Sequence, residues 1–258
     1  MPIGNTYISA SIITLNEEDN IRECLLSLDW VDEVVIVDSL SRDQTVAIGK
    51  EMGARVIDKP FAGHVKQKDF AVQSCQFDWV LCLDADERVT EDLKSKIIAL
   101  FEKYPDGALP HYGYTVKRRS FHLGRWIMHG GWYPDRNIRL FDRRHGKWSG
   151  VDPHDIIKVE GTPGHLDAAL DHYVFRDLAH NADQNNFFSG ISAKILFEKG
   201  KKPSLLKLFF KPPWKFVETY FLKRGFLDGL PGFIIAVGAA YSMFLKYAKL
   251  WEMYLKKR

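Results

Sequence analysis

Mostly apolar runs alternate with helical patterns over the first hundred residues. The apolar runs are short and predict buried strands, whereas apolar residues spaced three or four apart predict helices between them. The predicted strands are Tyr7–Leu15, Glu33–Asp38, Ala54–Ile57 and Trp79–Leu83. The predicted helices are Glu17–Leu28, about Asp43 to Met52, and Val65–Ser74. Buried strands separated by helices indicate a parallel sheet that is covered on both faces.

The pattern changes after Pro110. Between Pro110 and Val174 the chain is rich in glycine, aromatic residues and arginine, and from Arg176 onward it is helical. The middle region predicts antiparallel strands near Tyr112–Arg118, Ile138–Phe141 and Ile156–Glu160. We therefore expect an α/β domain over residues 1–175, divided near residue 100, and a helical region over residues 176–258.

Polar residues follow three of the predicted strands. In parallel sheets ligands bind beyond the carboxyl ends of the strands, so these residues are the first candidates for a site. Thr14 lies at the end of the first strand, Asn16 and Glu17 follow it, and Asp38 ends the second strand. Thr14, Asn16 and Asp38 could contact a nucleoside. Alternatively, Asn16 caps the first helix and Asp38 caps the helix after Asp43.

Asp84 and Asp86 follow the strand Trp79–Leu83. Side chains two residues apart on an extended segment point the same way, so both carboxylates can face one point. Carboxylate oxygens with room for further oxygen ligands suit Mg²⁺ or Mn²⁺ bound to a diphosphate. A pattern this short is also common in solvated loops. Lys66 and Lys68, at the start of a predicted helix, either face a phosphate or are solvated.

The charge is divided unevenly along the chain. The net charge is +3, but Glu198–Arg258 holds 13 Lys and Arg against four acidic residues, so its net charge is +9 and that of the rest is −6. This region also contains Gly229–Leu245, 17 residues without a charge. A spanning helix needs about 20 apolar residues, so helices lying in one leaflet of an anionic membrane fit better. Helices packed on the α/β domain, and a true span, are the alternatives.

The cysteines and the N-terminal sequence indicate the cellular compartment. The three cysteines are not in a zinc spacing and cannot all pair, and the N-terminus lacks the pattern of a signal peptide. A reducing, cytoplasmic setting is expected. The apolar content of the basic tail favours a membrane over nucleic acid as its partner.

The motifs taken together resemble a known family. TLNEEDNI, VVIVDSLSRDQT, VKQKDFA and WVLCLDADERV, in this order, are similar to family 2 glycosyltransferases with a GT-A fold. GRWIMHGGWYPDRNIRLFDRR, Pro153-His154-Asp155, RGFLDGLPGFIIAV and FLKYAKLWE resemble the bacterial lipopolysaccharide-core glucosyltransferases of the WaaE type. The resemblance runs from about Ser9 to Glu252. It implies a nucleotide-binding half over residues 1–100 and an acceptor-binding half over residues 101–175.

The resemblance also implies roles for single residues. It implies that the nucleoside is held by Thr14, Asn16, Glu17 and Asp38. Lys68 matches a basic residue facing the diphosphate, and Asp84 and Asp86 match the metal-binding DxD motif that holds Mg²⁺ or Mn²⁺. Asp155 matches the acidic position of the catalytic base, although this subfamily usually has glutamate after Val-His and this chain has Pro-His-Asp.

The acceptor side is less closely specified. Trp132 and neighbouring aromatic residues could stack on sugar rings, or belong to a packed loop. Arg139 and the nearby arginines could meet phosphates of an anionic acceptor, or form surface ion pairs. His154 could orient the base or the acceptor, or be structural.

The expected function is inverting, metal-dependent transfer of a hexose from a nucleotide sugar, with UDP-glucose as the expected donor. The expected acceptor is a lipopolysaccharide inner-core heptose or a related lipid-linked glycan, at the cytoplasmic face of the bacterial inner membrane. A polyprenyl-phosphate sugar transferase and a non-catalytic membrane-attached scaffold are the alternatives. A nucleotidyltransferase is disfavoured, because the loop after the first strand is acidic and has no glycine.

Overall fold

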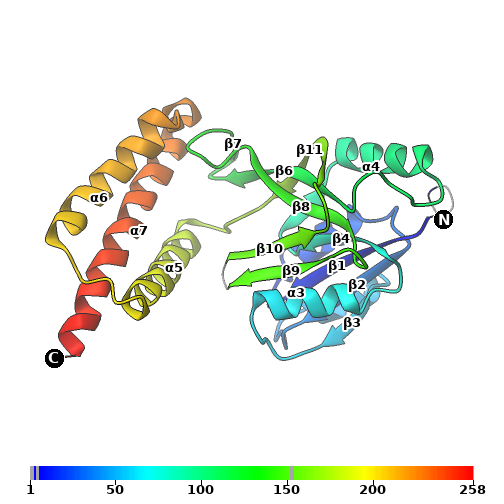
Figure 1. Cartoon of the computed structure of the whole chain (residues 1–258), viewed down its shortest axis with the longest axis horizontal. Helices are drawn as coiled ribbons and strands as arrows, with labels where there is room; N and C mark the ends of the chain where they lie inside the picture. Colours follow the sequence, from blue (N-terminus) through cyan, green and yellow to red (C-terminus); the bar gives the residue numbers. More distant parts are fainter. Residues whose placement is uncertain (1–2, 4–5, 152–153, 258) are drawn as a thin grey trace. The chain divides into compact units, whose positions relative to one another are not determined.

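The computed structural model describes residues 3, 6–151 and 154–257, with the side chains of residues 151 and 154 left out (Figure 1). The chain forms two compact units. The first comprises Met1–Arg118 and Asp135–His172, and the second comprises Arg119–Pro134 and Tyr173–Arg258. The division at residue 172 lies close to the boundary expected at 175. The segment Arg119–Pro134, by contrast, belongs to the same unit as the C-terminal helices.

The first unit is built on a mixed sheet whose N-terminal half is parallel. Its strands are β1 (Ile8–Thr14), β2 (Glu33–Asp38), β3 (Arg55–Asp58) and β4 (Trp79–Asp84). They lie side by side in the order β3-β2-β1-β4, and all three pairings are parallel. Their bounds agree with the predicted strands to within a residue or two at each end, which confirms this half of the α/β fold.

The other half of the sheet is antiparallel. Beyond β4 the order continues β8-β6-β11-β5, with β7 paired to β6. The bounds are β5 Glu87–Val89, β6 Gly113–His122, β7 Arg125–Ile127, β8 Asp135–Asp142 and β11 Gly164–His172. A separate two-stranded ribbon pairs β9 (Gly146–Val151) with β10 (His154–Val159). The sequence indicated three of these strands, and β5, β7, β9 and β11 were missed.

Each face of the sheet carries its own hydrophobic core. Successive side chains of a strand point to opposite faces, so neighbouring residues of β2 separate: Ile36 belongs to one core, and Val35 and Val37 to the other. The first core packs against helices α1 (Ile21–Leu26) and α4 (Glu91–Lys103). The second packs against α3 (His64–Gln73) and the β9–β10 ribbon. The parallel half is therefore covered on both faces, as its continuous apolar strands predict.

The first helix starts later than predicted, and two residues considered as helix caps do not act as caps. Helix α1 begins at Ile21 rather than Glu17, and its N-cap is Asn20, so Asn16 does not cap it. Helix α2 (Thr45–Glu51) has Gln44 as N-cap, so Asp38 does not cap that helix either. Asn16 instead has a φ of 55°. This left-handed conformation turns the chain before the helix, and asparagine adopts it more readily than most residues.

The second unit is mainly helical. Its helices are α5 (Leu178–Glu198), α6 (Leu205–Val217), a π-helical turn η1 (Glu218–Leu222), a 3₁₀ turn η2 (Gly225–Asp228) and α7 (Gly229–Lys256). Helix α7 packs along both α5 and α6. It is long and apolar enough to cross a membrane, on length and composition alone.

A buried aspartate ties the glycine-rich loop of this unit to the C-terminal helices. The carboxylate of Asp228, just before α7, accepts hydrogen bonds from the backbone N–H of His129 at 2.8 Å and of Met128 at 3.2 Å. Nδ1 of His129 lies 3.1 Å from the same carboxylate and Nη2 of Arg125 lies 3.4 Å from it. Two sequence motifs about a hundred residues apart, GRWIMHGG and RGFLDGLPG, thus form one structural element.

Glycine is required where η2 meets α7. A Cβ on Gly232 would overlap the carbonyl oxygen of Gly225, which is backbone and cannot rotate away. We expect Gly232→Ala to lower the free energy of unfolding by about 1–3 kcal/mol, because overpacking displaces backbone. Gly238→Ala on the same helix is the matched control. Its nearest neighbour is Nδ2 of Asn185 at 3.6 Å, so it should be neutral or stabilising by up to about 1 kcal/mol.

Thermal unfolding followed by circular dichroism measures both variants. Equal shifts in the two unfolding midpoints would contradict the close packing of Gly232 against Gly225.

Candidate active site

The polar residues after β1, β2 and β4 lie at one edge of the sheet. The strand register places Thr14 opposite Asp38, and Ile13 opposite Asp84. The carboxyl ends of three adjacent parallel strands therefore meet at this edge, where ligands bind in α/β sheets.

Asp38 forms the first part of the site. It is fully buried, and its carboxylate accepts hydrogen bonds from the hydroxyl of Thr14 at 2.7 Å and from the backbone N–H of Ser41 at 2.7 Å. The hydroxyl of Ser41 also donates to it, at 2.5 Å. A buried carboxylate must be hydrogen-bonded, and these donors satisfy it. Asp38 thus fixes the loop after β2 against the end of β1.

Asn16 and Glu17 complete this corner. The side-chain oxygen of Asn16 accepts a hydrogen bond from the backbone N–H of Arg42 at 2.9 Å. The backbone N–H of Asn16 donates to the hydroxyl of Ser41 at 2.8 Å. The backbone N–H of Glu17 donates to the hydroxyl of Thr45 at 2.8 Å. The loops after β1 and β2 are therefore held together by hydrogen bonds, with Asn16 exposed on top of them.

Lys68 occupies the centre of the site. Its ammonium lies 2.7 Å from Oδ1 of Asp84 and 2.9 Å from Oδ2 of Asp155. It also lies 4.6 Å from the ring centroid of Trp148, within the range of a cation–π interaction. Lys68 comes from α3, Asp84 from the end of β4, and Asp155 and Trp148 from the ribbon. Three separate segments of the first unit thus converge on one charge.

Arg139 contacts the other oxygen of Asp84. Its Nη2 lies 3.1 Å from Oδ2 of Asp84 and also pairs with the fully buried Glu87. Glu87 in turn accepts from the backbone N–H of Asp84 at 2.9 Å and lies 3.5 Å from Nη1 of Arg118. Arg139, assigned to the acceptor from sequence, is therefore buried behind Asp84, where it holds that carboxylate in place.

The cations determine the ionisation of Asp84. Burial by itself would raise the pKa of Asp84, but the charges of Lys68 and Arg139 outweigh burial and hold this pKa well below its usual range. Burial would likewise lower the pKa of Lys68, yet Asp84 and Asp155 raise it. Lys68 therefore remains a cation and Asp84 an anion at neutral pH.

Asp86 lies apart from this ion-pair network. Its Oδ2 is 3.2 Å from Nε2 of His172, at the end of β11. The two aspartates of the DxD motif thus have different partners: Asp84 contacts Lys68 and Arg139, and Asp86 contacts His172.

The carboxylates suit a divalent ion only if a ligand supplies further oxygens. Within the part of the chain that the structure describes, no group of three or more His, Cys, Asp or Glu side chains converges as a metal site. Both oxygens of Asp84 already face cations, which leaves Asp86 as the main donor. A hard carboxylate of this kind fits Mg²⁺ or Mn²⁺ shared with a diphosphate, since Mg²⁺ is often held by one or two carboxylates plus phosphate oxygens.

None of the contacts between described residues joins the remaining predicted residues to this network. Trp132 belongs to the second unit, where its ring stacks on His122 at 6.0 Å and meets Phe175 edge-on. His154 lies in β10, but its side chain and all of Pro153 are outside the described residues. Arg143 and Arg144 pair with Asp78, so they form surface ion pairs rather than part of this site.

Comparison with known proteins identifies the family. The family model described as "Glycosyl transferase family 2" matches residues 9–156, which include every residue of the network around Lys68. This chain belongs to glycosyltransferase family 2. The match covers more than half of the chain and shows that the protein is a glycosyltransferase.

Relatives of this glycosyltransferase extend over the whole chain. It is 33% identical over 259 residues to the lipopolysaccharide core biosynthesis glycosyltransferase LpsC of Rhizobium meliloti, covering 97% of this chain and 94% of the relative. It is also 33% identical over 261 residues to an uncharacterized glycosyltransferase of Rickettsia typhi, covering 97% and 89%. Both alignments include the C-terminal helices as well as the sheet.

Solved structures resemble the glycosyltransferase more distantly. A structure of S. aureus TarS aligns over 92% of this chain and 49% of its own, with a TM-score of 0.49 and 17% identity. The glucosyl-3-phosphoglycerate synthase of Mycobacterium tuberculosis, solved with Mn²⁺, UDP and glucosyl-3-phosphoglycerate, aligns over 76% and 80%, with a TM-score of 0.45 and 17% identity.

Three residues of the site were not predicted from the sequence. Glu87 directly follows the DxD motif. Its burial beside Arg139 could be predicted only if β8 were known to lie next to β4. His172 and Trp148 lie on strands that the pattern did not reveal. The alternation of β11, GHLDAALDH, in which every second residue is buried, is the signal that could have placed His172.

Proposed function

We propose that this glycosyltransferase transfers a hexose from a nucleotide sugar, with UDP-glucose as the expected donor, to a lipid-linked glycan at a membrane surface, with inversion. The observation that carries the proposal is Lys68, whose ammonium is shared by the DxD residue Asp84 and by Asp155. A donor diphosphate beside Asp84 and an acceptor hydroxyl beside Asp155 would then be adjacent.

The donor would lie across the ends of β1, β2 and β4. Asp38, Asn16 and Glu17 hold the loops after β1 and β2 together by hydrogen bonds. These loops suit a nucleoside, because they offer polar groups in fixed positions. Lys68 would face the diphosphate. A Mg²⁺ or Mn²⁺ ion held by Asp86 and diphosphate oxygens would neutralise charge on the leaving group. His172 would position Asp86 through the 3.2 Å contact.

Asp155 would act as the base. In an inverting transfer the acceptor hydroxyl attacks the anomeric carbon opposite the departing diphosphate, and a carboxylate within hydrogen-bond reach removes its proton. Lys68 keeps Asp155 close to the donor and would stabilise the negative charge that gathers on the leaving group. Arg139 supports the same geometry by fixing Asp84 from behind.

The acceptor is proposed from the relative LpsC, which is named for lipopolysaccharide core biosynthesis and aligns with nearly the whole chain. We infer that the acceptor is an inner-core heptose or a related lipid-linked glycan. Such acceptors are anchored in a membrane, so an enzyme with its own membrane-binding surface would meet them in two dimensions.

Helix α6 supports membrane attachment. Leu205, Leu206, Phe209, Phe210 and Trp214 are each more than half exposed along one side. A second side carries Lys207, Lys211 and Lys215, and a third, with the buried Pro212, packs against α7. An apolar face flanked by lysines is typical of a helix that lies in the membrane interface. At 13 residues, or about 20 Å, α6 is too short to span a bilayer.

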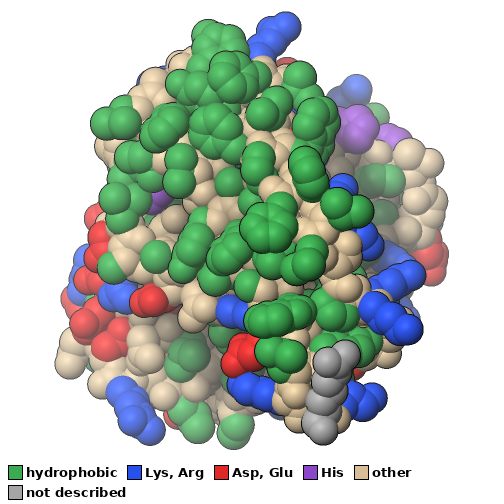
Figure 2. Space-filling model, turned by 90° about the vertical axis from the view of Figure 1, so that its left-hand side faces the viewer, with side chains coloured by type: hydrophobic (Ala, Val, Ile, Leu, Met, Phe, Trp, Pro, Cys, Tyr) green, Lys and Arg blue, Asp and Glu red, His purple; other side chains and the backbone are tan. Residues whose placement is uncertain are grey.

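Helix α7 adds a second apolar stripe, made of Leu230, Phe233, Val237, Tyr241, Phe244, Trp251 and Leu255. Figure 2 shows apolar side chains gathered on this side of the molecule, with lysines and arginines toward its margins. One face of α7 packs on α5 and α6. Nζ of Lys249, on α7, donates a hydrogen bond to the side-chain oxygen of Asn186, on α5, at 2.7 Å. These contacts favour a helix that lies in the interface over one that spans the membrane. The resemblance leads us to propose the cytoplasmic face of the inner membrane as the site of attachment.

The metal role of Asp86 can be tested by transfer assays. We expect Asp86→Asn to reduce kcat/KM at least 100-fold, because the ion loses its protein carboxylate, and we expect a chelator to abolish wild-type transfer until Mn²⁺ is restored. The control is Asp92→Asn, which removes an exposed carboxylate paired with Lys96 on α4. Full metal-dependent transfer by Asp86→Asn would refute the metal assignment.

The base is tested separately by Asp155→Asn, which keeps a hydrogen-bond acceptor for Lys68 but cannot take a proton. We expect kcat to fall about 10²–10⁴-fold with little change in donor KM. Asp155→Glu should retain part of the activity, since this position carries glutamate in the subfamily that the chain resembles. The control is Asp167→Asn, an exposed acid of β11 paired with Lys117. A kcat within threefold of wild type for Asp155→Asn would exclude it as the base.

Membrane attachment is tested by co-sedimentation with vesicles. We expect Phe209→Glu/Phe210→Glu to lose binding to all vesicles. We expect Lys207→Gln/Lys211→Gln to lose about 30-fold in affinity for anionic vesicles only, since each lysine near such a surface contributes about 1 kcal/mol. Lys50→Gln/Lys103→Gln, which removes two exposed lysines from α2 and α4, is the control. Unchanged binding by the double phenylalanine variant would exclude α6 as the attachment site.

A further inference from the structure

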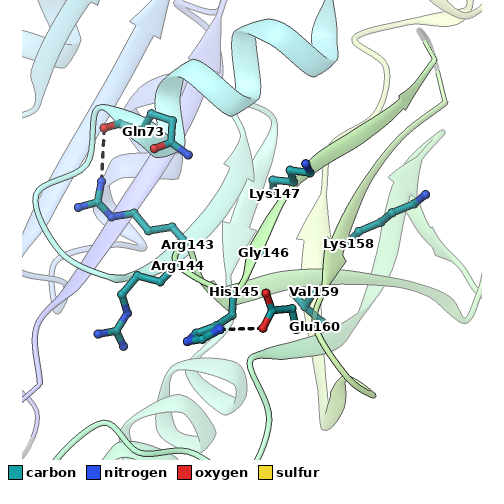
Figure 3. A pocket seen from close by; sticks show the side chains of 9 residues that line it. All are labelled: Gln73, Arg143, Arg144, His145, Gly146, Lys147, Lys158, Val159 and Glu160. Carbon is teal, nitrogen blue, oxygen red and sulfur yellow. Dashed lines mark hydrogen bonds and ion pairs between the residues drawn. The ribbon is translucent and has the colours of Figure 1, made fainter.

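A pocket opens on the first unit, beside the ends of the β9–β10 ribbon that carry Gly146 and Val159. Its volume is about 430 Å³, within the range of small-molecule sites. The end of α3, the loop between β8 and β9, and the two ribbon strands form its walls (Figure 3).

The pocket lies away from the candidate active site. Asp142, which precedes the pocket loop, pairs with Trp79 at the first residue of β4, whereas Asp84 is the last residue of that strand. A strand rises about 3.3 Å per residue, so the two ends are on the order of 17 Å apart. The pocket is therefore at the opposite edge of the sheet from the DxD motif.

Two unpaired lysines dominate this pocket. Lys147 and Lys158 are directly opposite each other in the ribbon, and both side chains are exposed. Like charges at opposite positions of a strand pair repel each other. Among the described residues, neither ammonium has a carboxylate within ion-pair distance. Arg143 and Arg144, by contrast, are already balanced by Asp78 and Asp142.

The rest of the pocket offers polar groups of another kind. His145 Nδ1 lies 2.9 Å from Oε2 of Glu160, and the ring of His145 stacks on Tyr112 with centroids 3.9 Å apart. Gln73 closes the opposite wall, where its backbone carbonyl accepts from Arg143 at 3.4 Å. Carboxylate and amide groups of this kind bind hydroxyls.

We propose that this pocket binds a phosphorylated sugar, with the phosphate between Lys147 and Lys158 and the hydroxyls at Glu160 and Gln73. An anion between the lysines removes their mutual repulsion and gains charge-assisted hydrogen bonds. The concave shape suits a single sugar phosphate. Glu160 disfavours a polyanion such as nucleic acid, which would instead need a row of cations.

Calorimetric titration with glucose 6-phosphate, inorganic phosphate and glucose tests the binding. We expect glucose 6-phosphate to bind more tightly than either of the others. Lys147→Gln/Lys158→Gln should weaken its binding at least tenfold, whereas Lys50→Gln/Lys103→Gln, with the same loss of charge, should change it less than twofold. Glucose 6-phosphate should also raise the unfolding temperature of the wild type but not of the pocket variant.

The thermal measurement also shows whether the pocket variant is folded, and relief of the repulsion should leave it at least as stable as the wild type. Absence of wild-type binding at millimolar glucose 6-phosphate, or equal binding by the pocket variant, would overturn the proposal. Equal affinity for inorganic phosphate and glucose 6-phosphate would mean that the pocket binds the phosphate group and not the sugar. This result would also contradict the proposal.

The binding of a sugar phosphate does not depend on the proposed function. The inference that this sugar phosphate belongs to the acceptor does rest on it. If the ligand is a phosphorylated sugar of the acceptor glycan, Lys147→Gln/Lys158→Gln should raise KM for that acceptor but not for its dephosphorylated form. If it is a free metabolite, the variant should leave both KM values unchanged while losing glucose 6-phosphate binding. Asp86→Asn separates the two proposals, because it should abolish transfer and leave glucose 6-phosphate binding intact.

Discussion

A single buried ammonium group holds the candidate active site together. Lys68 contacts Asp84 from the parallel half of the sheet and Asp155 from the ribbon, and it lies over the ring of Trp148. A lysine buried without such partners would lose its charge or destabilise the fold. The two carboxylates and the cation therefore stabilise one another, and their arrangement brings the side of the site expected to hold the donor next to the proposed base.

The arrangement also explains why several charges cluster where the core could have been apolar. Asp84 faces two cations, and Glu87 behind it faces Arg139 and Arg118. Removing one partner from such a network leaves an uncompensated buried charge, which typically costs about 3–5 kcal/mol. The network thus fixes the orientation of Asp84 before any ligand is present. Asp86 lies 3.2 Å from His172 and outside this network, so its carboxylate keeps more freedom to bind a ligand.

Sequence patterns predicted the parallel half of the fold well because its strands are buried on both faces and its helices separate them. The register then followed from the fold type, so the convergence of Thr14, Asp38 and Asp84 could be expected. The antiparallel half was harder, since β11 is only alternately apolar and its partner β5 is distant in sequence. Arg139 illustrates the limit: its charge suggested the surface, and only the pairing of β8 with β4 shows that it is buried beside Asp84.

The proposed function requires that Asp84, Asp86 and Lys68 together accommodate the diphosphate of a nucleotide. Calorimetric titration of the wild-type protein with UDP, in the presence and absence of Mn²⁺, addresses it without any acceptor or membrane. We expect UDP to bind at one site per chain and Mn²⁺ to strengthen this binding at least tenfold. No detectable UDP binding, or the same affinity with and without Mn²⁺, would contradict it.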